Sequence, residues 1–472
     1  MHLDRAEVVA EFGAAKFKDR RLAARLQGLG GKLTARPDVS FPEVFESSAE
    51  LEAAYRFFGN VAVVPDIILS GHFEGLRRRG GEESTVLVVH DTTTISFRGD
   101  GQRRTHDGNA LPKQRFFAHV SLVVSDDGLR KPLGVACLAT WYRGSTFGGG
   151  GWHHEHDRWW ETALLASERL QHKSVIHIMD READDYWLLH QLMSNDQRFI
   201  VRARIKGTRT RMLADDDFRQ LHEVVASLEA VVERDVKLGQ RRNKSRNVND
   251  ERHPARDKRT TRLAIAARAV TLKRPKKHPS QPKSRRAAAI AETIALNVVR
   301  VWEPAPPPGE APVEWVLLTT EPIDNEEQIL RIVDRYRARW IIEEYNKALK
   351  TGCAYESRQL EDYDSLVNAL AVFAPIACTL LELRSAAQRT PEAKAELVLT
   401  PSQIEVLRVL GRIPLPEEPT HREVLLAVAA LGGHIKWSGN PGWLTLGRGY
   451  ADLLRLAAGW EAAKLQLARD QR

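Results

Sequence analysis

Three acidic residues in this chain have the chemistry and the setting to bind metal ions. Asp91 and Asp180 each follow an apolar run, STVLVVH and SVIHIM, and Glu343 lies in the charged segment 336–350, YRARWIIEEYNKALK. Mg²⁺ prefers oxygen ligands and usually takes one or two carboxylates together with substrate phosphates. Two such ions about 4 Å apart can activate the attacking oxygen and stabilise the leaving one in phosphodiester chemistry. We therefore predict that the three carboxylates converge to hold two Mg²⁺ ions, for which Mn²⁺ can substitute.

The segment 336–350 contains no Gly or Pro and is rich in helix formers, which predicts one continuous helix. At about 100° per residue, one arc of roughly 60° would hold four of its side chains: Tyr336, Arg339, Glu343 and Lys350. The arc would run for about 21 Å, the length of several phosphates along a nucleic-acid strand. Arginine can grip a phosphate as a bidentate fork and lysine as a point charge. The alternative is a solvated helix face held by i,i+4 and i,i+7 charge pairs.

Apolar runs predict the strands that would position the two aspartates. The sequences STVLVVHDTTTISF, FFAHVSLVVSDD and LGVACLATWYR indicate three successive strands in an antiparallel meander. A helix at about 157–170, the strand SVIHIMD, a second helix and the strand RFIVRARI follow. An acid at the C-terminal end of a buried strand is where open α/β sheets place ligand chemistry. The pattern therefore predicts a mixed sheet with flanking helices, of the α/β or α+β class.

Several motifs resemble those of a known family and occur in the family's order along the chain. The spacing Tyr-x2-Arg-x3-Glu-x6-Lys, with WIIEEYNKALKTG around it, resembles the signature of the insertion-sequence-four family of bacterial DDE transposases. HDTTTISF and IMDREADDYW are similar to that family's first and second aspartate motifs, and AAYRFF and VEWVLLTTEP extend the similarity. The resemblance implies a ribonuclease-H-like fold for the mixed sheet. It also implies cut-and-paste transposition, in which transposon ends are cleaved, pass through a DNA hairpin and join a target.

The resemblance assigns DNA contacts to two further residues. Trp315 lies 21 residues before Tyr336, the separation at which the family has a tryptophan that receives a base turned out of the duplex. An aromatic face suits an unstacked base, although a core tryptophan on a buried strand is the competing explanation. Arg202, in FIVRAR, matches an arginine after the family's fifth strand that contacts DNA. Its alternative is a solvent-facing residue of an edge strand.

Residues 1–70 are predicted to form a helical domain that is rich in basic side chains. One segment and the motif AAYRFF supply them: Lys16, Lys18, Arg20, Arg21, Arg25, Lys32 and Arg56. By resemblance this is the module that recognises transposon ends in double-stranded DNA, with Arg20, Arg21, Arg25 and Arg56 as its phosphate contacts. Phosphate contacts carry no sequence information directly, so these residues do not indicate which bases are recognised. A solvated basic surface is the alternative.

Residues 71–375 are predicted to form the catalytic domain, and 206–312 to form a basic, β-rich insertion within it. The run 241–286 is dense in lysine and arginine, which indicates a DNA clamp that binds through phosphate neutralisation. Residues 376–472 are predicted to form a helical C-terminal domain. The family implies that two transposases pair there on DNA, whereas packing of these helices within one chain explains the sequence equally well. The apolar stretch 366–383 contains Asn, Pro and Glu, which indicates a buried helix rather than a membrane span.

Composition agrees with a DNA-binding protein of the cytoplasm. The formal net charge is +8 and 28% of the residues are charged, which favours an acidic partner such as nucleic acid. The three cysteines, Cys137, Cys353 and Cys378, form no CxxC pair, which argues against a disulfide framework or a zinc site. The first residues, MHLDRAEVVAEFG, lack the pattern of a signal peptide. Together with the resemblance, which implies a bacterial protein, these features lead us to expect association with the nucleoid and no membrane partner.

Two other functions fit the same residues. A catalytically silent DNA-binding regulator derived from a transposase would keep the basic surfaces and bind DNA without cutting it. Another ribonuclease-H-like metal nuclease would keep the three acids and act on a different nucleic acid.

Overall fold

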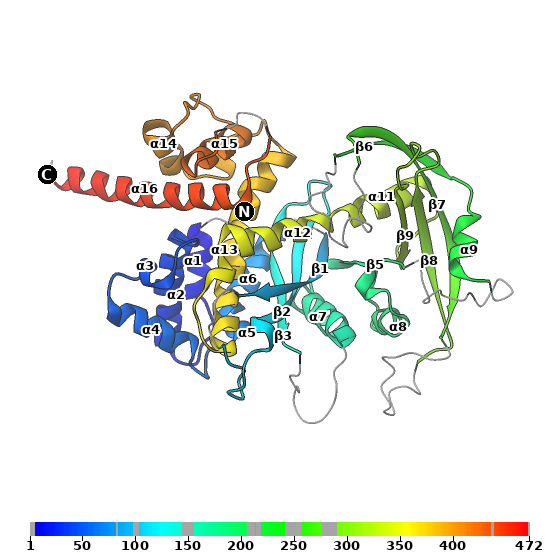
Figure 1. The fold of residues 1–472 in the computed structure, drawn as a ribbon, viewed down its shortest axis with the longest axis horizontal. Coiled ribbons are helices and arrows are strands. Elements are labelled where there is room, and N and C mark those ends of the chain that lie inside the picture. The colour runs from blue at the N-terminus through cyan, green and yellow to red at the C-terminus, as the bar shows by residue number, and fades with distance from the viewer. Residues whose placement is uncertain are drawn as a thin grey trace. The chain divides into compact units, whose positions relative to one another are not determined.

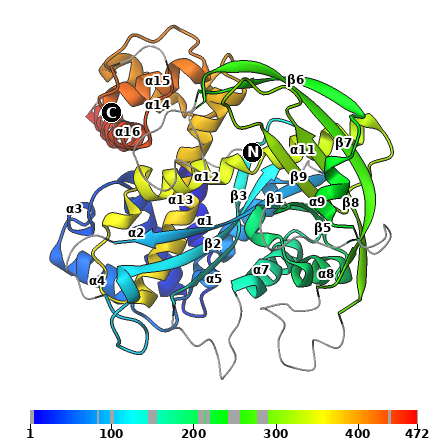
Figure 2. The same cartoon turned by 45° about the vertical axis from the view of Figure 1, so that its right-hand side comes forward.

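The computed structural model divides the chain between two compact units. It describes residues 5–81, 84–97, 103–143, 155–204, 213, 219–240, 256–275, 290–435 and 439–470. Unit 1 comprises Met1–Trp152, Leu165–Ser174 and Trp340–Arg472, and unit 2 comprises His153–Leu164 and Val175–Arg339. Figure 1 labels the helices and strands, and Figure 2 shows the same elements after a turn of 45°.

Unit 1 begins with six helices, which confirms the predicted helical N-terminal segment. They are α1 (Arg5–Gly13), α2 (Arg20–Ala35), α3 (Phe41–Val44), α4 (Ser48–Phe58), α5 (Pro65–Ile68) and α6 (Ser70–Arg79). The Asp19 carboxylate accepts the backbone N–H of Arg21 at the start of α2, and the Ser47 hydroxyl accepts that of Glu50 in α4. Such caps satisfy N–H groups that have no partner within the helix. Helix α1 packs against both α2 and α6.

Three antiparallel strands follow in unit 1, as the apolar runs predict. They are β1 (Thr85–Ser96), β2 (Arg115–Ser125) and β3 (Pro132–Trp141), in the order β3-β2-β1. Asp91 lies in the middle of β1, opposite Val120 of β2, because the β-branched residues after it continue the pairing as far as Ser96. Asp91 is therefore not at the C-terminal end of a strand, where the pattern of open α/β sheets would put it.

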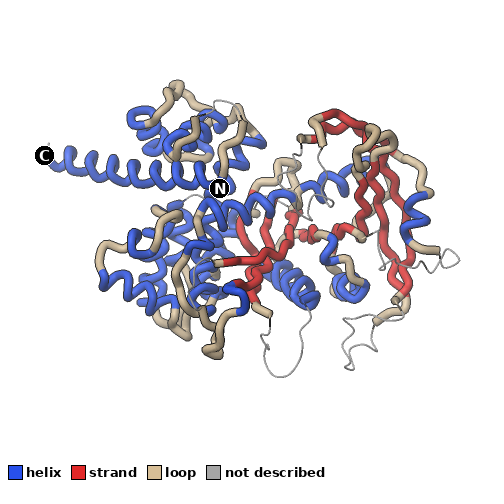
Figure 3. Tube along the Cα trace, viewed as in Figure 1, coloured by secondary structure: helices blue, strands red, loops and turns tan. Residues whose placement is uncertain are grey.

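The part of unit 1 after Arg339 is helical, which confirms the prediction for the C-terminal region (Figure 3). Its elements are α12 (Trp340–Lys347), the π-helical turn η4 (Ala348–Gly352), the 3-10 turn η5 (Tyr355–Ser357), α13 (Tyr363–Arg389), the 3-10 turn η6 (Ala395–Leu397), α14 (Pro401–Leu410), α15 (His421–Leu431) and α16 (Trp443–Asp470). Helix α13 is long and apolar enough to cross a membrane, but its most apolar stretch is completely buried within the protein. It packs against β3, α4, α5 and α15, which confirms the prediction of a buried helix.

Unit 2 contains the rest of the mixed sheet. Its strands are β4 (Ser174–Met179), β5 (Arg198–Arg202), β6 (Val232–Leu238), β7 (Arg259–Lys273), β8 (Thr293–Trp302) and β9 (Glu314–Thr319), in the order β4-β5-β9-β8-β7-β6. Strands β4 and β5 are parallel, and the remaining pairs are antiparallel. Strands β6, β7 and β8 confirm the β-rich insertion. Much of its basic run, residues 241–255 and 276–289, lies outside the described residues.

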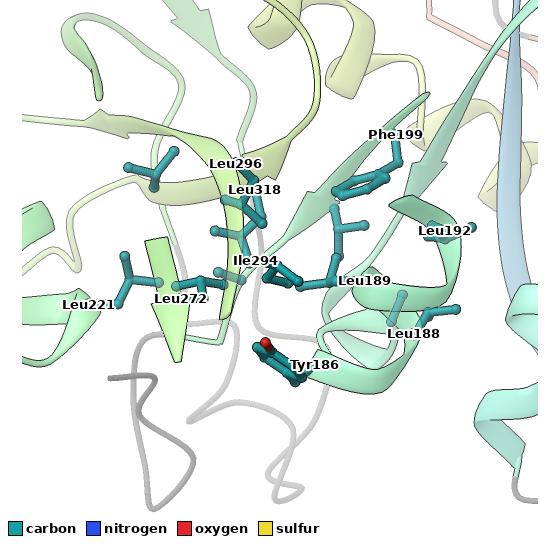
Figure 4. Close-up of a cluster of buried hydrophobic side chains, with 14 of the residues drawn as sticks. Tyr186, Leu188, Leu189, Leu192, Phe199, Leu221, Leu272, Ile294, Leu296 and Leu318 are labelled. Atoms are coloured by element: carbon teal, nitrogen blue, oxygen red, sulfur yellow. The ribbon is translucent and has the colours of Figure 1, made fainter. Parts of the chain in front are cut away.

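The helices of unit 2 cover this sheet. They are α8 (Tyr186–Ser194), α9 (Leu221–Ala226) and α11 (Glu326–Arg337), and α7 (Glu155–Arg169) spans the boundary with unit 1. Figure 4 shows leucines of α8 next to Phe199 of β5 and apolar side chains of β7, β8 and β9. Burying this apolar surface stabilises the unit and fixes α8 against the strands. The mixed sheet, the β-rich insertion and the helical ends together establish the predicted α/β class.

The prediction of one continuous helix over 336–350 is wrong. Helix α11 ends at Arg337, Ala338 and Arg339 form a turn, α12 begins at Trp340, and Lys350 lies in the π-helical turn η4. Backbone N–H groups of Ala338 and Arg339 bond three residues back, to Arg335 and Tyr336. Nothing in the local sequence breaks the helix, so tertiary packing overrides propensity here. The single arc of Tyr336, Arg339, Glu343 and Lys350 therefore does not exist as a straight stripe.

Candidate active site

A side-chain hydrogen bond joins α12 to the aspartate of β1. The Asn346 amide Nδ2 donates to Asp91 Oδ2 at 2.8 Å, and α12 packs against β1 (Figure 1). Asn346 is only 9% exposed, and its Oδ1 is buried without a hydrogen-bond partner in the part of the chain that the structure describes. A buried amide oxygen beside a carboxylate is a site that a water molecule or a cation would satisfy.

Glu343 lies on the same face of α12 as Asn346. Three residues separate them, which places the two side chains about 60° apart and one turn from each other. Glu343 is half-buried. The helix register therefore places Glu343 on the side of α12 that carries Asn346.

Glu344 is directed elsewhere and has its own partners. It accepts hydrogen bonds from Lys347 Nζ at 2.7 Å and from Trp443 Nε1 at 3.0 Å, and the Arg384 guanidinium lies 3.4 Å away. Burial raises the pKa of the Glu344 carboxyl, but these three groups outweigh it and hold the pKa below its usual value. Glu344 is thus an ionised structural carboxylate rather than a second acid of the site.

Lys350 also lies along β1. Its Nζ donates to the backbone oxygen of Thr94 at 2.5 Å and lies 3.9 Å from the carboxylate of Glu356, which accepts the backbone N–H of Ser96 at 2.9 Å. Burial lowers the pKa of Lys350, and Glu356 and Asp91 partly oppose that shift. The π-helical turn η4 carries this lysine, and π turns occur often at functional sites. Unit 1 thus brings Lys350 near Asp91 on β1, and the helix register puts Glu343 on the same face of α12 as Asn346.

Asp180 follows β4 directly in unit 2, the strand-end position that the pattern predicts. Its carboxylate accepts the backbone N–H of Glu182 at 2.8 Å and caps the short 3-10 turn η2 (Arg181–Ala183). Asp185 caps α8 by accepting the backbone N–H of Leu188 at 3.1 Å.

Unit 2 also gathers an aromatic pair and two arginines. The Trp315 and Tyr336 rings meet edge to face, with centroids 5.7 Å apart. Tyr336 is only 3% exposed. Burial raises its pKa, Arg202 and Arg339 oppose that rise, and Asp180 adds to it.

These electrostatic effects place the five residues in one neighbourhood. Arg202 is the last residue of β5, donates to the backbone oxygen of Glu314 at 3.3 Å, and has a pKa lowered by burial. The Tyr336 hydroxyl is thus inside the protein and not on a solvent-facing stripe.

The structure therefore places the predicted site residues in two groups. Asp91, Glu343 and Lys350 belong to unit 1, and the others belong to unit 2: Asp180, Arg202, Trp315, Tyr336 and Arg339. Within the described ranges, no group of three or more His, Cys, Asp or Glu side chains is gathered as a metal site. Convergence of all three acids stays a prediction.

Two residues of the site were not predicted from the sequence, Asn346 and Glu356. Asn346 was detectable in principle, because it follows Glu343 by three residues and so shares its helix face. Glu356 lies outside any helix shared with Lys350 and gives no comparable signal.

The four predicted end-binding arginines lie on α2 and α4. Arg20, Arg25 and Arg56 are exposed, and Arg21 is also exposed but pairs with Asp19 at 2.9 Å. Two lysines of the same region have acidic partners, because Lys16 pairs with Glu74 and Lys32 with Glu50. Exposed guanidinium groups on these helices are suited to phosphate contacts.

The chain has a mixed α/β sheet, with Asp91 on β1, Asp180 directly after β4, and Glu343 on α12, which packs against β1. Comparison with family models specifies the class: residues 82–374 match the transposase DDE domain, and residues 5–63 match the transposase DNA-binding domain. The DDE match covers more than half of the chain. The protein therefore belongs to the transposase DDE domain family, and it carries a DNA-binding domain ahead of the catalytic one.

A solved structure gives a weaker similarity. It is a piggyBac transposase synaptic complex with hairpin DNA, 11% identical in sequence, with 82% of this chain and 73% of that chain covered and a TM-score of 0.35. At this score the likeness does not extend to individual residues.

Proposed function

We propose that the protein is a cut-and-paste DNA transposase of the insertion-sequence-four branch, similar to the Tn-five transposase. It would cleave transposon ends in double-stranded DNA with Mg²⁺, pass through a DNA hairpin and join the ends to a target. One observation carries the proposal: Asn346 of the glutamate-bearing helix donates to Asp91 within a chain of the DDE family. The motif spacing supports the branch.

Metal binding is proposed at Asp91, Asp180 and Glu343. Hard oxygen donors suit Mg²⁺. The buried Oδ1 of Asn346 beside Asp91 has no hydrogen-bond partner among the described residues, which fits a site completed by a cation and its water. When bound, two Mg²⁺ ions would activate an attacking water or 3′-hydroxyl and stabilise the departing 3′-oxygen. The protein would contribute the position of its carboxylates, and Asn346 holds that of Asp91.

Phosphate binding is proposed for Lys350, Arg339 and Arg202. Lys350 already directs its ammonium along β1, where a phosphate could replace or join the Thr94 oxygen as its acceptor. The charges of Arg202 and Arg339 act on the buried Tyr336 hydroxyl, so Tyr336 would orient these arginines rather than bind the DNA backbone from an exposed face. Holding the reacting strand in line lowers the barrier by positioning and by charge neutralisation.

Base stacking is proposed for Trp315. Its indole is half-buried and its neighbour Tyr336 supports it from the edge, which leaves part of an aromatic face for an unstacked base. End recognition is proposed for the arginines of α2 and α4, and a homodimer on DNA is proposed for the assembled complex.

The deciding experiment uses a supercoiled plasmid that carries the DNA flanking this gene. Wild-type protein with Mg²⁺ is expected to nick and linearise it, and Asp91→Ala, Asp180→Ala and Glu343→Ala are expected to bind the ends without cutting. Glu229→Ala, which removes an exposed acid of unit 2, serves as the control and should cut normally.

Three other outcomes would contradict the assignment or favour a different function. Cleavage retained by any of the three variants refutes the assignment of that acid. A wild-type mobility shift without nicking favours a silent regulator, and preferential cutting of an RNA–DNA hybrid favours another metal nuclease.

A further inference from the structure

The carboxylate next to Glu343 joins α12 to the C-terminal helix. Glu344 Oε2 accepts the indole N–H of Trp443, the first residue of α16, at 3.0 Å. Arg384 of α13 lies 3.4 Å from the same oxygen. The other oxygen, Oε1, accepts from Lys347 Nζ, which is exposed to solvent.

Arg384 adds a third helix to this contact, so that Glu344, Arg384 and Trp443 form a node between α12, α13 and α16. Its guanidinium lies 4.6 Å above the Trp443 ring, and its Nη1 donates to the backbone oxygen of Pro441 at 2.7 Å. The Arg384 side chain is only 13% exposed. Helix α12, helix α13 and the first turn of α16 are therefore held together by interactions that are directional and largely shielded from water.

A second contact joins α16 to the turn that carries Lys350. Gly447 of α16 packs on Gly352 of η4 so closely that a Cβ added to Gly447 would lie 2.4 Å from the Gly352 oxygen. Glycine allows this backbone approach. Helix α16 thus contacts the segment 340–352 at both ends, through Glu344 and through Gly352.

The opposite side of the same segment faces β1, where Asn346 bonds Asp91 and Lys350 bonds Thr94. Helix α12 has eight residues, whereas isolated helices shorter than about 12–15 residues are marginal in water. Its position must therefore come from its tertiary contacts. Those contacts include β1 on one side, the node with α16 on the other, and α13, where the Tyr345 hydroxyl donates to the backbone oxygen of Ala374 at 3.2 Å.

We propose that Trp443 and Arg384, acting through Glu344, are positioning residues that hold Glu343 and Lys350 against β1. This inference rests on the proposed function, because it assigns the C-terminal helix a part in setting the geometry of that active site. A displacement of about 1 Å at a catalytic group can cost roughly 100-fold in rate. Loss of the node should therefore slow strand cleavage but leave the affinity for end DNA unchanged, because the proposal gives these residues no contact with DNA.

The test compares four variants. Glu344→Ala removes the acceptor, and Glu344→Gln keeps an acceptor oxygen without the charge. Trp443→Phe removes only the indole donor and keeps a ring beneath Arg384. Lys347→Ala removes the exposed partner of the same carboxylate and serves as the matched control.

Three quantities are measured for each variant: the single-turnover cleavage rate, the dissociation constant for end DNA, and hydrogen exchange of the backbone of α12. We expect Glu344→Ala to slow cleavage by about 10- to 100-fold and Trp443→Phe by about 10-fold, with faster exchange in α12 and unchanged end binding. Glu344→Gln should recover part of the rate, and Lys347→Ala should behave as wild type.

Several results would overturn the inference: a wild-type rate and unchanged exchange in Glu344→Ala, an equal loss in Lys347→Ala, or equal losses of cleavage and end binding. If Glu344→Ala does not fold, the cleavage rate and α12 exchange of Trp443→Phe test the inference in its place, and wild-type values for both would overturn it. If wild-type protein cuts no DNA, the proposed function fails, and hydrogen exchange of α12 alone decides whether the node positions this helix.

Discussion

Asn346 Nδ2 lies 2.8 Å from Asp91 Oδ2, a contact between residues 255 positions apart in the sequence. It links the strand that carries the first aspartate to the helix that carries Glu343. The amide can donate to the carboxylate only if α12 holds its register, so one hydrogen bond reports the orientation of the whole helix. The remaining amide oxygen stays buried beside the site.

Removal of the Asn346 amide should therefore reduce cleavage. We expect Asn346→Ala to slow cleavage by roughly 10- to 100-fold, the usual effect of losing a group that orients a metal-binding carboxylate. Asn346→Asp should be worse, because it puts a second negative charge next to Asp91. Single-turnover cleavage and end binding are measured side by side, with Lys347→Ala as the exposed neighbour. A wild-type rate in Asn346→Ala would show that the contact has no catalytic role.

Local patterns predicted the strands well and the helix segment poorly. Strands β1 to β5 follow apolar runs that a buried strand needs, so the sequence reveals them directly. The helix breaks at Ala338 and Arg339, where the sequence has no Gly or Pro. Helix propensity therefore predicts a helix that continues through this break. The burial of Tyr336 against Trp315 follows from that break, because α11 and α12 no longer share one face.

Contacts between residues far apart in the sequence could not be predicted, for a different reason. A single sequence shows that Glu343 and Asn346 share a helix face, but it does not show which strand lies opposite that face. The bond to Asp91 and the ion pair of Lys350 with Glu356 depend on tertiary packing. The amide of Asn346 orients one of the three acids, Asp91, and no pattern in the sequence predicts that bond.

The arginines of α2 and α4 should differ in their contribution to DNA binding. Arg25 and Arg56 are exposed, whereas Arg21 donates to Asp19 through two guanidinium nitrogens. We expect Arg25→Ala and Arg56→Ala each to reduce the slope of log affinity against log salt by about one. Arg21→Ala should reduce it less, because its charge is already partly neutralised. Fluorescence anisotropy of labelled end DNA over a salt series measures the slope, and equal effects at all three positions would contradict the expectation.

Two glycines of α2 should respond oppositely to alanine. A Cβ on Gly28 would meet no atom within 4 Å, whereas a Cβ on Gly30 would lie 2.4 Å from the buried ring of Phe12. Gly28→Ala should raise the free energy of unfolding by about 0.5–1 kcal/mol, because alanine loses less backbone entropy in a helix. Gly30→Ala should lower it by about 1–3 kcal/mol, since the ring must move. Urea denaturation measures both changes, and effects of the same sign would refute the packing of α1 on α2.

Acid should destabilise the protein through His177 of β4. The ring is fully buried, its Nε2 donates to Gln197 Oε1 at 3.2 Å, and burial lowers its pKa from 6.5 to about 4. Burial disfavours the charged ring, so the unfolded chain binds a proton more readily than the folded one. The neutral ring therefore contributes its full stability above pH 6.5, and this contribution is lost as the pH falls from 6.5 toward 4.

We expect this histidine to account for a loss of about 2 kcal/mol in the free energy of unfolding between pH 7 and pH 5. His177→Gln removes the titration and should flatten the pH dependence by that amount, whatever it does to stability at pH 7. His172→Gln changes an exposed histidine and should leave the pH dependence as in wild type. Urea denaturation at the two pH values measures each difference. Parallel pH profiles for wild type and His177→Gln would mean that the folded protein accommodates a charged ring on β4.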